Sequence, residues 1–246
     1  MSVTMRSESV QRLRATFGVD GPLRYISVLD MGRLWERLLR RAGVPLAYTQ
    51  GFNPHPRLQF ASALPVGYSS ECELLDLWLA ERMEPAEFAA LASDQAPLGL
   101  TVLQVEEVPL KAPAPQALVR AAHYQVRLWA EAPREDVERA LGQLLARPSI
   151  PRQRQKKGHL ADYDLRPLIQ EIHYLSSERG CHELYMILRA GAGGSGRPEE
   201  VLDALGLQGT QYTIHRVRLI WGDQVDKFRF TTQSMRSETR PEEVRS

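Results

Sequence analysis

Residues 48–67 read YTQGFNPHPRLQFASALPVG, and glycine and proline prescribe much of the backbone of this stretch. Gly51 can adopt a positive φ, while Pro54 and Pro56 fix their own φ and keep the preceding residues out of the helical region. The pattern predicts a stiff extended or turn segment. Such a segment is typical of a recognition loop, because loops often carry function, and equally of a structural crossover. The candidate recognition residues are Gly51, Phe52, Asn53, Pro54, His55 and Arg57.

On the N-terminal side of this stretch we expect a strand and then a helix. Apolar and polar residues alternate over 11–19, which predicts a half-buried strand with Arg12 and Arg14 on its polar side. Residues 27–30 (Ser-Val-Leu-Asp) have the pattern of a capping box, which predicts a helix that ends near residue 42. One helix face would hold four arginines, either as favourable charges near the helix C-terminus or as an anion-binding face: Arg33, Arg37, Arg40 and Arg41.

On the C-terminal side the periodicity predicts two repeats of one arrangement. Strands are expected over 58–64, 71–79 and 101–108, with a helix that begins at 84–85, so the first order is β-α-β-β-α-β. After the proline-rich joint 109–115, a similar order returns. Its expected strands are 124–130, 168–175, 183–190 and 212–221, and its expected helices are 133–145 and 198–205.

The sequence therefore predicts an α+β protein made of two tandem ferredoxin-like units. The first would span residues 11–110 and contain the GFNPHPR loop, and the second would span 111–222 and contain a basic loop. Residues 1–10 are expected to be a disordered N-terminus. Residues 223–246 are polar and alternate in charge, so we expect a disordered tail.

The composition excludes several classes of protein. Of 246 residues, 43% are hydrophobic and 25% charged, and the net charge of +1 does not by itself require nucleic acid or a membrane as a partner. Two widely separated cysteines, and an N-terminus without an apolar core, fit a reduced cytoplasmic protein. No apolar run approaches the roughly 18 residues of a membrane span. We expect a cytoplasmic protein with no membrane partner.

The segment 151–159, PRQRQKKGH, is the best candidate for a site that binds RNA or another phosphate-rich ligand. It is expected to be a loop that binds such a ligand, and the alternative is a mobile hairpin tip that its charges keep soluble. The candidate phosphate-binding residues are Arg152, Arg154, Lys156, Lys157 and Arg166. Asp164 and Arg166 would lie on one side of an extended segment, either as a structural ion pair or to hold Arg166 ready for an anion.

Acidic residues in the expected strand 71–79 do not favour a metal site. Glu71 and Glu73 share one strand face and Asp76 lies on the other, so the three cannot easily bind one ion. We expect instead buried acids that face Arg24 or Arg57. Walker, HExxH and GxSxG motifs are absent, and the six histidines show no ligand spacing. We therefore expect no metal, no cofactor and no self-contained catalytic site.

Three segments resemble the radical-SAM-associated (radical-SAM-linked) family of bacterial proteins, a domain of unknown function. They are GPLRYIS at 21–27, the long run from LLRRAGVPLAYTQGFNPHPR to ECELLD at 38–76, and DYDLRPLI at 162–169. The motif acids are Asp30, Glu73, Asp76 and Asp164. Val28 stands where the family usually has histidine. The resemblance implies a radical-SAM enzyme as partner, on a separate chain because this one lacks cysteines for an iron–sulfur cluster.

Together these observations predict an accessory module that binds RNA or a ribonucleoprotein and delivers it to a radical-SAM enzyme. One alternative is a protein–protein scaffold that docks the same partner without RNA. The other is an RNA-processing enzyme with His55 or His159 as general base.

Overall fold

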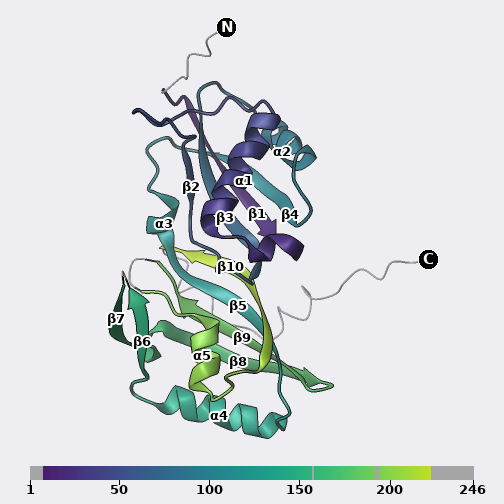
Figure 1. Cartoon of the computed structure of the whole chain (residues 1–246), viewed down its shortest axis with the longest axis vertical. Coiled ribbons are helices and arrows are strands. Elements are labelled where there is room, and N and C mark those ends of the chain that lie inside the picture. Colours follow the sequence, from purple (N-terminus) through teal and green to yellow (C-terminus); the bar gives the residue numbers. More distant parts are fainter. Residues whose placement is uncertain (1–7, 157, 192–193, 223–246) are drawn as a thin grey trace, which may run out of the picture.

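The computed structural model describes residues 8–156, 158–191 and 194–222, and it shows a mixed α+β protein (Figure 1). The expected disordered segments lie largely outside the described residues. One long sheet runs through the molecule in the strand order β4-β1-β3-β10-β5-β9-β8, and short β2 also pairs with β3. Within the described residues, no helix has the length and apolar character needed to cross a membrane.

The first part of the sheet has the predicted ferredoxin-like order. Its strands lie in the order β4-β1-β3-β2, and all neighbours are antiparallel. The elements are β1 (Gln11–Val19), η1 (Gly21–Tyr25), α1 (Val28–Arg41), β2 (Leu58–Phe60), β3 (Ser69–Leu79), α2 (Pro85–Asp94) and β4 (Leu100–Val108). β2 is shorter than the predicted strand 58–64, because the chain leaves the edge of β3 after a last bond from Ala61 N to Leu74 O.

The second part repeats this order as β10-β5-β9-β8, again with antiparallel neighbours. The elements are α3 (Pro115–Leu118), β5 (Val119–Trp129), α4 (Arg134–Ala146), β6 (Pro151–Lys156), β7 (His159–Asp164), η2 (Arg166–Leu168), β8 (Ile169–Glu178), β9 (Cys181–Arg189), α5 (Pro198–Ala204) and β10 (Gln211–Trp221). β6 and β7 form a separate two-stranded sheet inserted between α4 and β8. The two tandem ferredoxin-like units are therefore present.

The two units share one sheet because β10 pairs in parallel with the start of β3. Only two residue pairs make this junction, His215 with Ser69 and Arg216 with Ser70. A second link joins the units nearby, where the hydroxyl of Tyr68 donates a hydrogen bond to the Glu199 carboxylate at the start of α5. The junction thus contains few backbone pairs, and hydrogen bonds between side chains add to them.

Each unit has its own main hydrophobic core. In the first, alternate residues of β1 (Leu13, Ala15 and Phe17) pack against Trp35 and Leu38 of α1. The second core lies between its sheet and helices α4 and α5, and it extends across the junction to Ala61, Tyr68 and Leu74 of the first unit. Ser27 is the N-cap of α1 as predicted, since Asp30 N donates to Ser27 Oγ at 3.2 Å. That hydroxyl donates in turn to the Asp30 carboxylate and lowers the pKa of Asp30.

The polar side of β1 is not solvated as predicted. Arg12 is 1% exposed and Asp76 is fully buried. Asp76 accepts hydrogen bonds from Arg12 Nε at 2.9 Å and from Arg14 Nε at 2.7 Å. Arg12 also donates to the carbonyls of Ala112 and Pro113, so the joint after β4 covers this part of the sheet. The expectation failed because alternation shows which residues share a face and not what covers that face.

Loss of the Asp76 charge should strongly destabilise the fold. Asp76→Asn leaves two arginines, one of them fully buried, without a counter-ion, which we expect to lower the free energy of unfolding by about 3–5 kcal/mol. Urea unfolding followed by circular dichroism measures this. Asp94→Asn, at the exposed end of α2, is the control and should change stability by less than about 0.5 kcal/mol. Equal stability of the two variants would contradict the structural role of Asp76.

His123 on β5 gives the fold a pH dependence. Its side chain is 5% exposed, and its Nδ1 shares a hydrogen bond with the hydroxyl of Tyr185 on β9. Burial, followed by the charge of Arg218, lowers the pKa of His123 from 6.5 to about 4. The folded protein therefore keeps this imidazole neutral where an unfolded chain would already protonate it.

Folding stability should fall as the pH drops from 6.5 towards 4, because only the unfolded state takes up the proton of His123 in this window. The full effect is up to about 3 kcal/mol. His123→Gln, which can still bond Tyr185, should flatten this slope in urea titrations at a series of pH values. His55→Gln, on an exposed loop, should leave it unchanged. An unaltered slope in His123→Gln would show that other groups cause the effect.

Candidate functional site

The predicted recognition loop is a narrow excursion whose two legs hydrogen bond to each other. Thr49 N donates to His55 O at 2.8 Å, and His55 N donates to Thr49 Oγ1 at 3.0 Å. Gly51 has a φ of +129°, a backbone conformation that would be strained for any residue with a side chain. Phe52 at the tip is fully exposed. Asn53 is also exposed, and Pro54 is half-buried. The loop is thus held at its base and open at its tip.

Arg57 does not point out of this loop. Its guanidinium donates to Ser9 Oγ at 2.6 Å and lies 4.8 Å from the ring centre of Trp78. Arg12 stacks on the same ring at 4.7 Å. Arg57 therefore fixes the base of the loop to the first unit, and Phe52, Asn53 and His55 are the predicted recognition residues whose side chains the loop exposes.

The basic segment forms the β6–β7 hairpin, where a loop was expected. Arg154 donates to both Glu200 oxygens, at 2.7 and 2.6 Å, and lies 4.7 Å from the ring centre of Tyr163. Burial, with the Glu200 carboxylate next, raises the pKa of Tyr163 to about 12. Arg152 is half-buried, and its Nε has no hydrogen-bond partner in the described part of the chain. Lys157 and the side chain of Lys156 lie outside the described residues.

The side chains of Asp164 and Arg166 hydrogen bond to backbone groups. They do not form the ion pair with each other that was one expectation. Asp164 Oδ1 accepts the N–H groups of Ile150 at 2.7 Å and Arg166 at 2.9 Å, and these bonds lower the pKa of Asp164. The Arg166 guanidinium donates to the carbonyls of Leu145 and Ile169. Both residues therefore connect the hairpin to the second unit.

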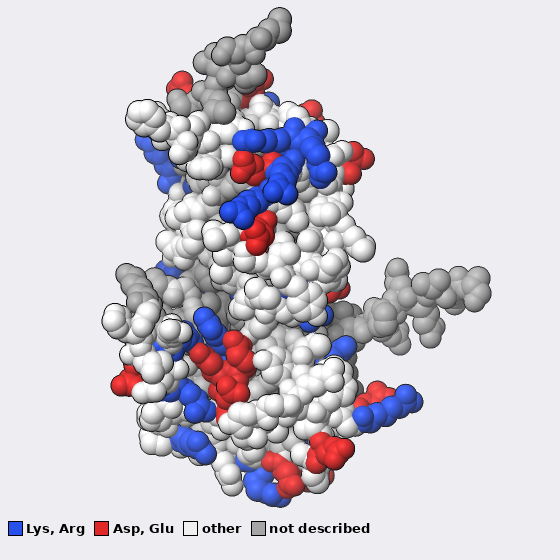
Figure 2. Space-filling view, viewed as in Figure 1, with Lys and Arg blue, Asp and Glu red and all other residues white. Residues whose placement is uncertain are grey.

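The arginines of α1 form the basic area visible over that helix in Figure 2. Arg33 pairs with Asp30 at 3.0 Å, and Arg40 pairs with Glu36 at 2.8 Å. Arg41 donates to the carbonyl of Gln95. Three of the four arginines thus have partners on the protein.

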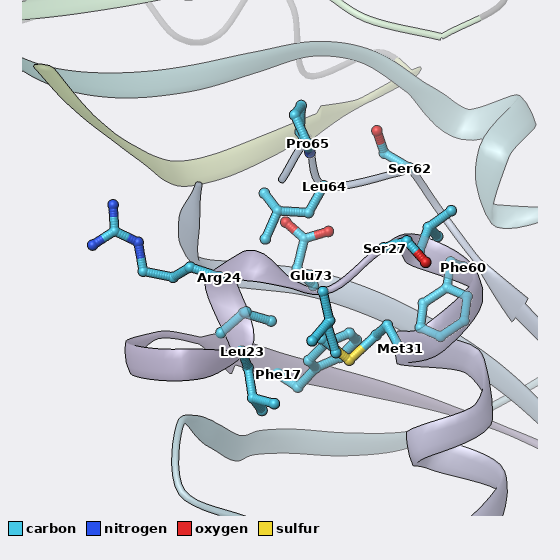
Figure 3. Close-up of a pocket in the computed structure, with 13 residues that line it drawn as sticks. Phe17, Leu23, Arg24, Ser27, Met31, Phe60, Ser62, Leu64, Pro65 and Glu73 are labelled. Carbon is cyan, nitrogen blue, oxygen red and sulfur yellow. The ribbon is translucent and has the colours of Figure 1, made fainter. Parts of the chain in front are cut away.

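A pocket opens where η1, the start of α1 and the segment after β2 meet (Figure 3). Its wall is mainly apolar, with Phe17, Val19, Leu23, Ile26, Val28, Met31, Phe60, Leu64 and Pro65. The carboxylate of Glu73 points into it beside Leu64. The free volume is about 20 Å³, enough for about one water molecule and not for a metabolite.

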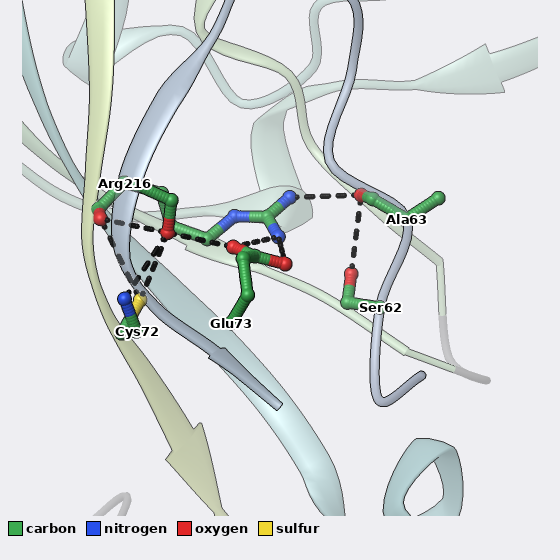
Figure 4. A network of polar contacts seen from close by, with 6 residues as sticks. Ser62, Ala63, Cys72, Glu73 and Arg216 are labelled. Carbon is green, nitrogen blue, oxygen red and sulfur yellow. Dashed lines mark hydrogen bonds and ion pairs between the residues drawn. The ribbon is translucent and has the colours of Figure 1, made fainter. Parts of the chain in front are cut away.

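Glu73, which lines this pocket, forms a buried ion pair with Arg216 of β10 (Figure 4). Arg216 Nη1 donates to both Glu73 oxygens, at 2.9 and 3.1 Å, and Nη2 donates to Ala63 O at 3.0 Å. Burial disfavours the guanidinium charge, but the Glu73 carboxylate and the neighbouring Tyr124 and Cys72 together outweigh this effect and raise the pKa of Arg216. The prediction that the buried acids face Arg24 or Arg57 is wrong, because Glu73 pairs with Arg216 and Asp76 with Arg12 and Arg14.

Four exposed apolar side chains belong to the segments that line the pocket. They are Tyr25, Val28, Leu29 and Val66, which are 67, 38, 72 and 59% exposed. Val28 lines the pocket itself, and the other three directly neighbour lining residues in the sequence. We call these four the apolar rim. The sequence did not single it out, because a single exposed apolar residue is common, and only the fold brings η1, α1 and the 65–67 turn together. Arg216 was also missed, since it lies 143 positions from its partner.

The described residues contain no group of three or more His, Cys, Asp or Glu placed to hold a metal ion. His55 and His159 lie on different units, on the loop after α1 and at the start of β7. The structure therefore does not bring the two candidate bases together.

Comparison with solved structures gives distant likenesses. A chain in the crystal structure of a Cbf5–Nop10–Gar1 complex has a TM-score of 0.47 at 12% identity, over 83% of this chain and 48% of that one. A chain in the structure of an H/ACA RNP bound to a substrate RNA has a TM-score of 0.44 at 12% identity, over 83% and 47%. This chain spans about half the length of both. An unknown protein from Galdieria sulphuraria has a TM-score of 0.26 at 12% identity, over 84% and 98%.

None of these likenesses bears on what the chain binds. Comparison with curated proteins gives no match. A family model matches residues 12–198, which include the pocket, the recognition loop and the hairpin. The sequence-based prediction of a bacterial domain of unknown function is thereby confirmed. The chain belongs to the family described as "Uncharacterized protein conserved in bacteria (DUF2344)".

Proposed function

We propose that the chain is a non-catalytic accessory module that docks a separate radical-SAM enzyme through the apolar rim. The rim is the observation that carries the proposal. Contiguous exposed apolar side chains on a soluble protein mark surfaces that another protein covers. The hollow at their centre holds about 20 Å³, so its natural occupant is one small side-chain group of a covering partner and not a free ligand.

The rim is held in place before any partner binds. Gly67 N donates to Arg24 O at 2.6 Å, and the Arg24 guanidinium donates to Gly67 O at 2.9 Å, so η1 and the turn after Pro65 are tied together. Beneath them lies the Glu73–Arg216 pair. A surface that is already ordered loses little conformational entropy on association, which favours specific docking.

The sequence supports the class of partner. The resemblance to radical-SAM-associated proteins implies a radical-SAM enzyme, and two cysteines are too few for the three ligands of its iron–sulfur cluster. The redox chemistry would then belong to the partner, and this chain would supply binding and orientation.

A charge placed in the rim should prevent docking. The test co-expresses the chain with the radical-SAM enzyme of the same genome and measures the dissociation constant of the purified pair. Leu29→Glu should weaken the complex at least about tenfold, because it buries an unpaired carboxylate in the interface. Leu98→Glu is the matched control, since Leu98 is 84% exposed and lies outside the rim. Equal affinity of the two variants would exclude the rim, and no complex at all would exclude this class of partner.

RNA binding at the β6–β7 hairpin is the second candidate function. The observation that favours it is the composition of β6, which carries Arg152, Arg154 and Lys156 and no acid, on a two-stranded sheet separate from the main one. Arg154 is held by Glu200, so Arg152, Lys156 and Lys157 would contact the phosphates.

Reversal of these three charges should weaken RNA binding and its salt dependence. With Arg152, Lys156 and Lys157 changed to Glu, affinity for bulk cellular RNA at about 50 mM salt should fall more than tenfold. The slope of log affinity against log salt should also become shallower by about 2. The control changes Arg33, Arg37 and Arg40 of α1 to Glu, which alters net charge by the same amount. Equal losses in both variants would indicate non-specific attraction and not a hairpin site.

A further inference from the structure

A second and larger cavity lies on the side of the first sheet away from α1. Leu13, Ala15 and Phe17 of β1 face α1, so the alternate residues Arg14 and Thr16 face away from it. Arg14 and Thr16 line a cleft of about 330 Å³ together with residues of β3, β4 and the C-terminal end of β10. This volume is within the range of about 300–1,000 Å³ typical of small-molecule sites. We call it the β-face cleft.

A fixed cation and an indole form one wall of the β-face cleft. Arg14 donates to Asp76 through Nε at 2.7 Å and through Nη2 at 2.9 Å, and its guanidinium lies 5.2 Å from the ring centre of Trp221. Its Nη1 forms no hydrogen bond within the described chain. The Asp76 carboxylate is fully buried, so Arg14 is held in one orientation by a group that no ligand can displace.

Polar side chains, including one of negative and one of positive charge, line other parts of the cleft. Gln104 and Glu106 of β4 are exposed on one side, and Arg218 of β10 is exposed on the other. Cys72 lines the cleft as well, and burial raises the pKa of its thiol to about 12, so this residue adds no charge at neutral pH. The cleft thus combines an amide, a carboxylate, two arginines and an aromatic ring.

We propose that the β-face cleft binds a nucleotide, either free or within single-stranded RNA. The base contacts Trp221 and places its polar edge against Gln104 and Glu106, and the phosphate lies towards Arg218. Stacking on an aromatic ring and hydrogen bonds to an exposed base edge are the usual means by which proteins hold an unpaired base. This site is distinct from the apolar rim and from the hairpin.

The residue set fits a nucleotide better than a simple anion or a cation. A bare phosphate would gain from the two arginines but would be repelled by Glu106, which has no role in holding it. A base resolves this conflict, because its amino or imino hydrogens can donate to Glu106 while its phosphate remains near Arg218. A divalent cation is disfavoured, because Glu106 is accompanied by two guanidinium groups.

The test is binding of a fluorescently labelled ten-nucleotide single-stranded RNA to the full chain at about 50 mM salt, followed by anisotropy. Trp221→Ala should weaken binding at least about fivefold, as expected for loss of one stacking contact. Arg218→Gln should weaken binding and reduce the salt slope by about one charge. The matched controls are Trp129→Ala and Arg127→Gln, because both residues are exposed on β5 outside the cleft. Thermal unfolding of each variant, with Trp221→Phe as the conservative change, checks that the fold is retained.

Competition separates the two sources of the nucleotide. If GMP, AMP, CMP or UMP at millimolar concentration displaces the labelled RNA, the site binds a single nucleotide. If only unlabelled RNA displaces it, the site requires a nucleotide within a strand. Gln104→Ala should change the order of preference among the four. The proposal is overturned if no nucleotide or RNA binds. It is also overturned if Trp221→Ala binds as the parent does, or if the hairpin reversal alone abolishes binding. Loss of partner docking in Leu29→Glu has no bearing on this site.

Discussion

Buried carboxylates paired with arginines from neighbouring strands are the constraint on which this structure depends. Glu73 and Arg216 lie across the junction of the two units, where only two backbone residue pairs join β3 to β10. Either charge alone would be costly to bury, so the pair is stable only when the two units are in register. Asp76 imposes the same condition within the first unit through Arg12 and Arg14. The ion pairs thus specify how the strands meet, in addition to any net stability that they supply.

Two hollows lie on opposite sides of β3. On the α1 side, Glu73 lines the apolar pocket and pairs with Arg216 of the second unit, and the start of α1 and the segment after β2 line the rest. On the other side, residues of β1, β3, β4 and the end of β10 line the β-face cleft, and Arg14 and Trp221 together form one of its walls. This cleft therefore draws residues from both units, and its shape depends on how the units meet.

Local sequence patterns were sufficient for the fold and insufficient for the sites. Period-two alternation and the Ser27 capping box located most strands and the start of α1, because these signals depend on residues a few positions apart. The partner of Glu73 lies 143 positions away, and the apolar rim draws on three separate segments. The basic segment was recognised by its charge alone. Its pairing as a hairpin joins residues close in the sequence, but the salt bridge of Arg154 to Glu200 joins residues 46 positions apart, which spacing does not encode.

The placement of the sites indicates how one small protein could serve two partners at once. The apolar rim is uncharged and surrounds a hollow too small for a ligand, which suits a protein surface. The β-face cleft is polar and larger, which suits a nucleotide. Because β1 and β3 form a single layer, residues of opposite parity on these strands serve the two sites, as Phe17 and Glu73 do for the pocket and Thr16 and Cys72 for the cleft. A partner that covers the rim therefore leaves the cleft open, so the two proposed ligands would bind on opposite faces of this layer without competition for the same side chains.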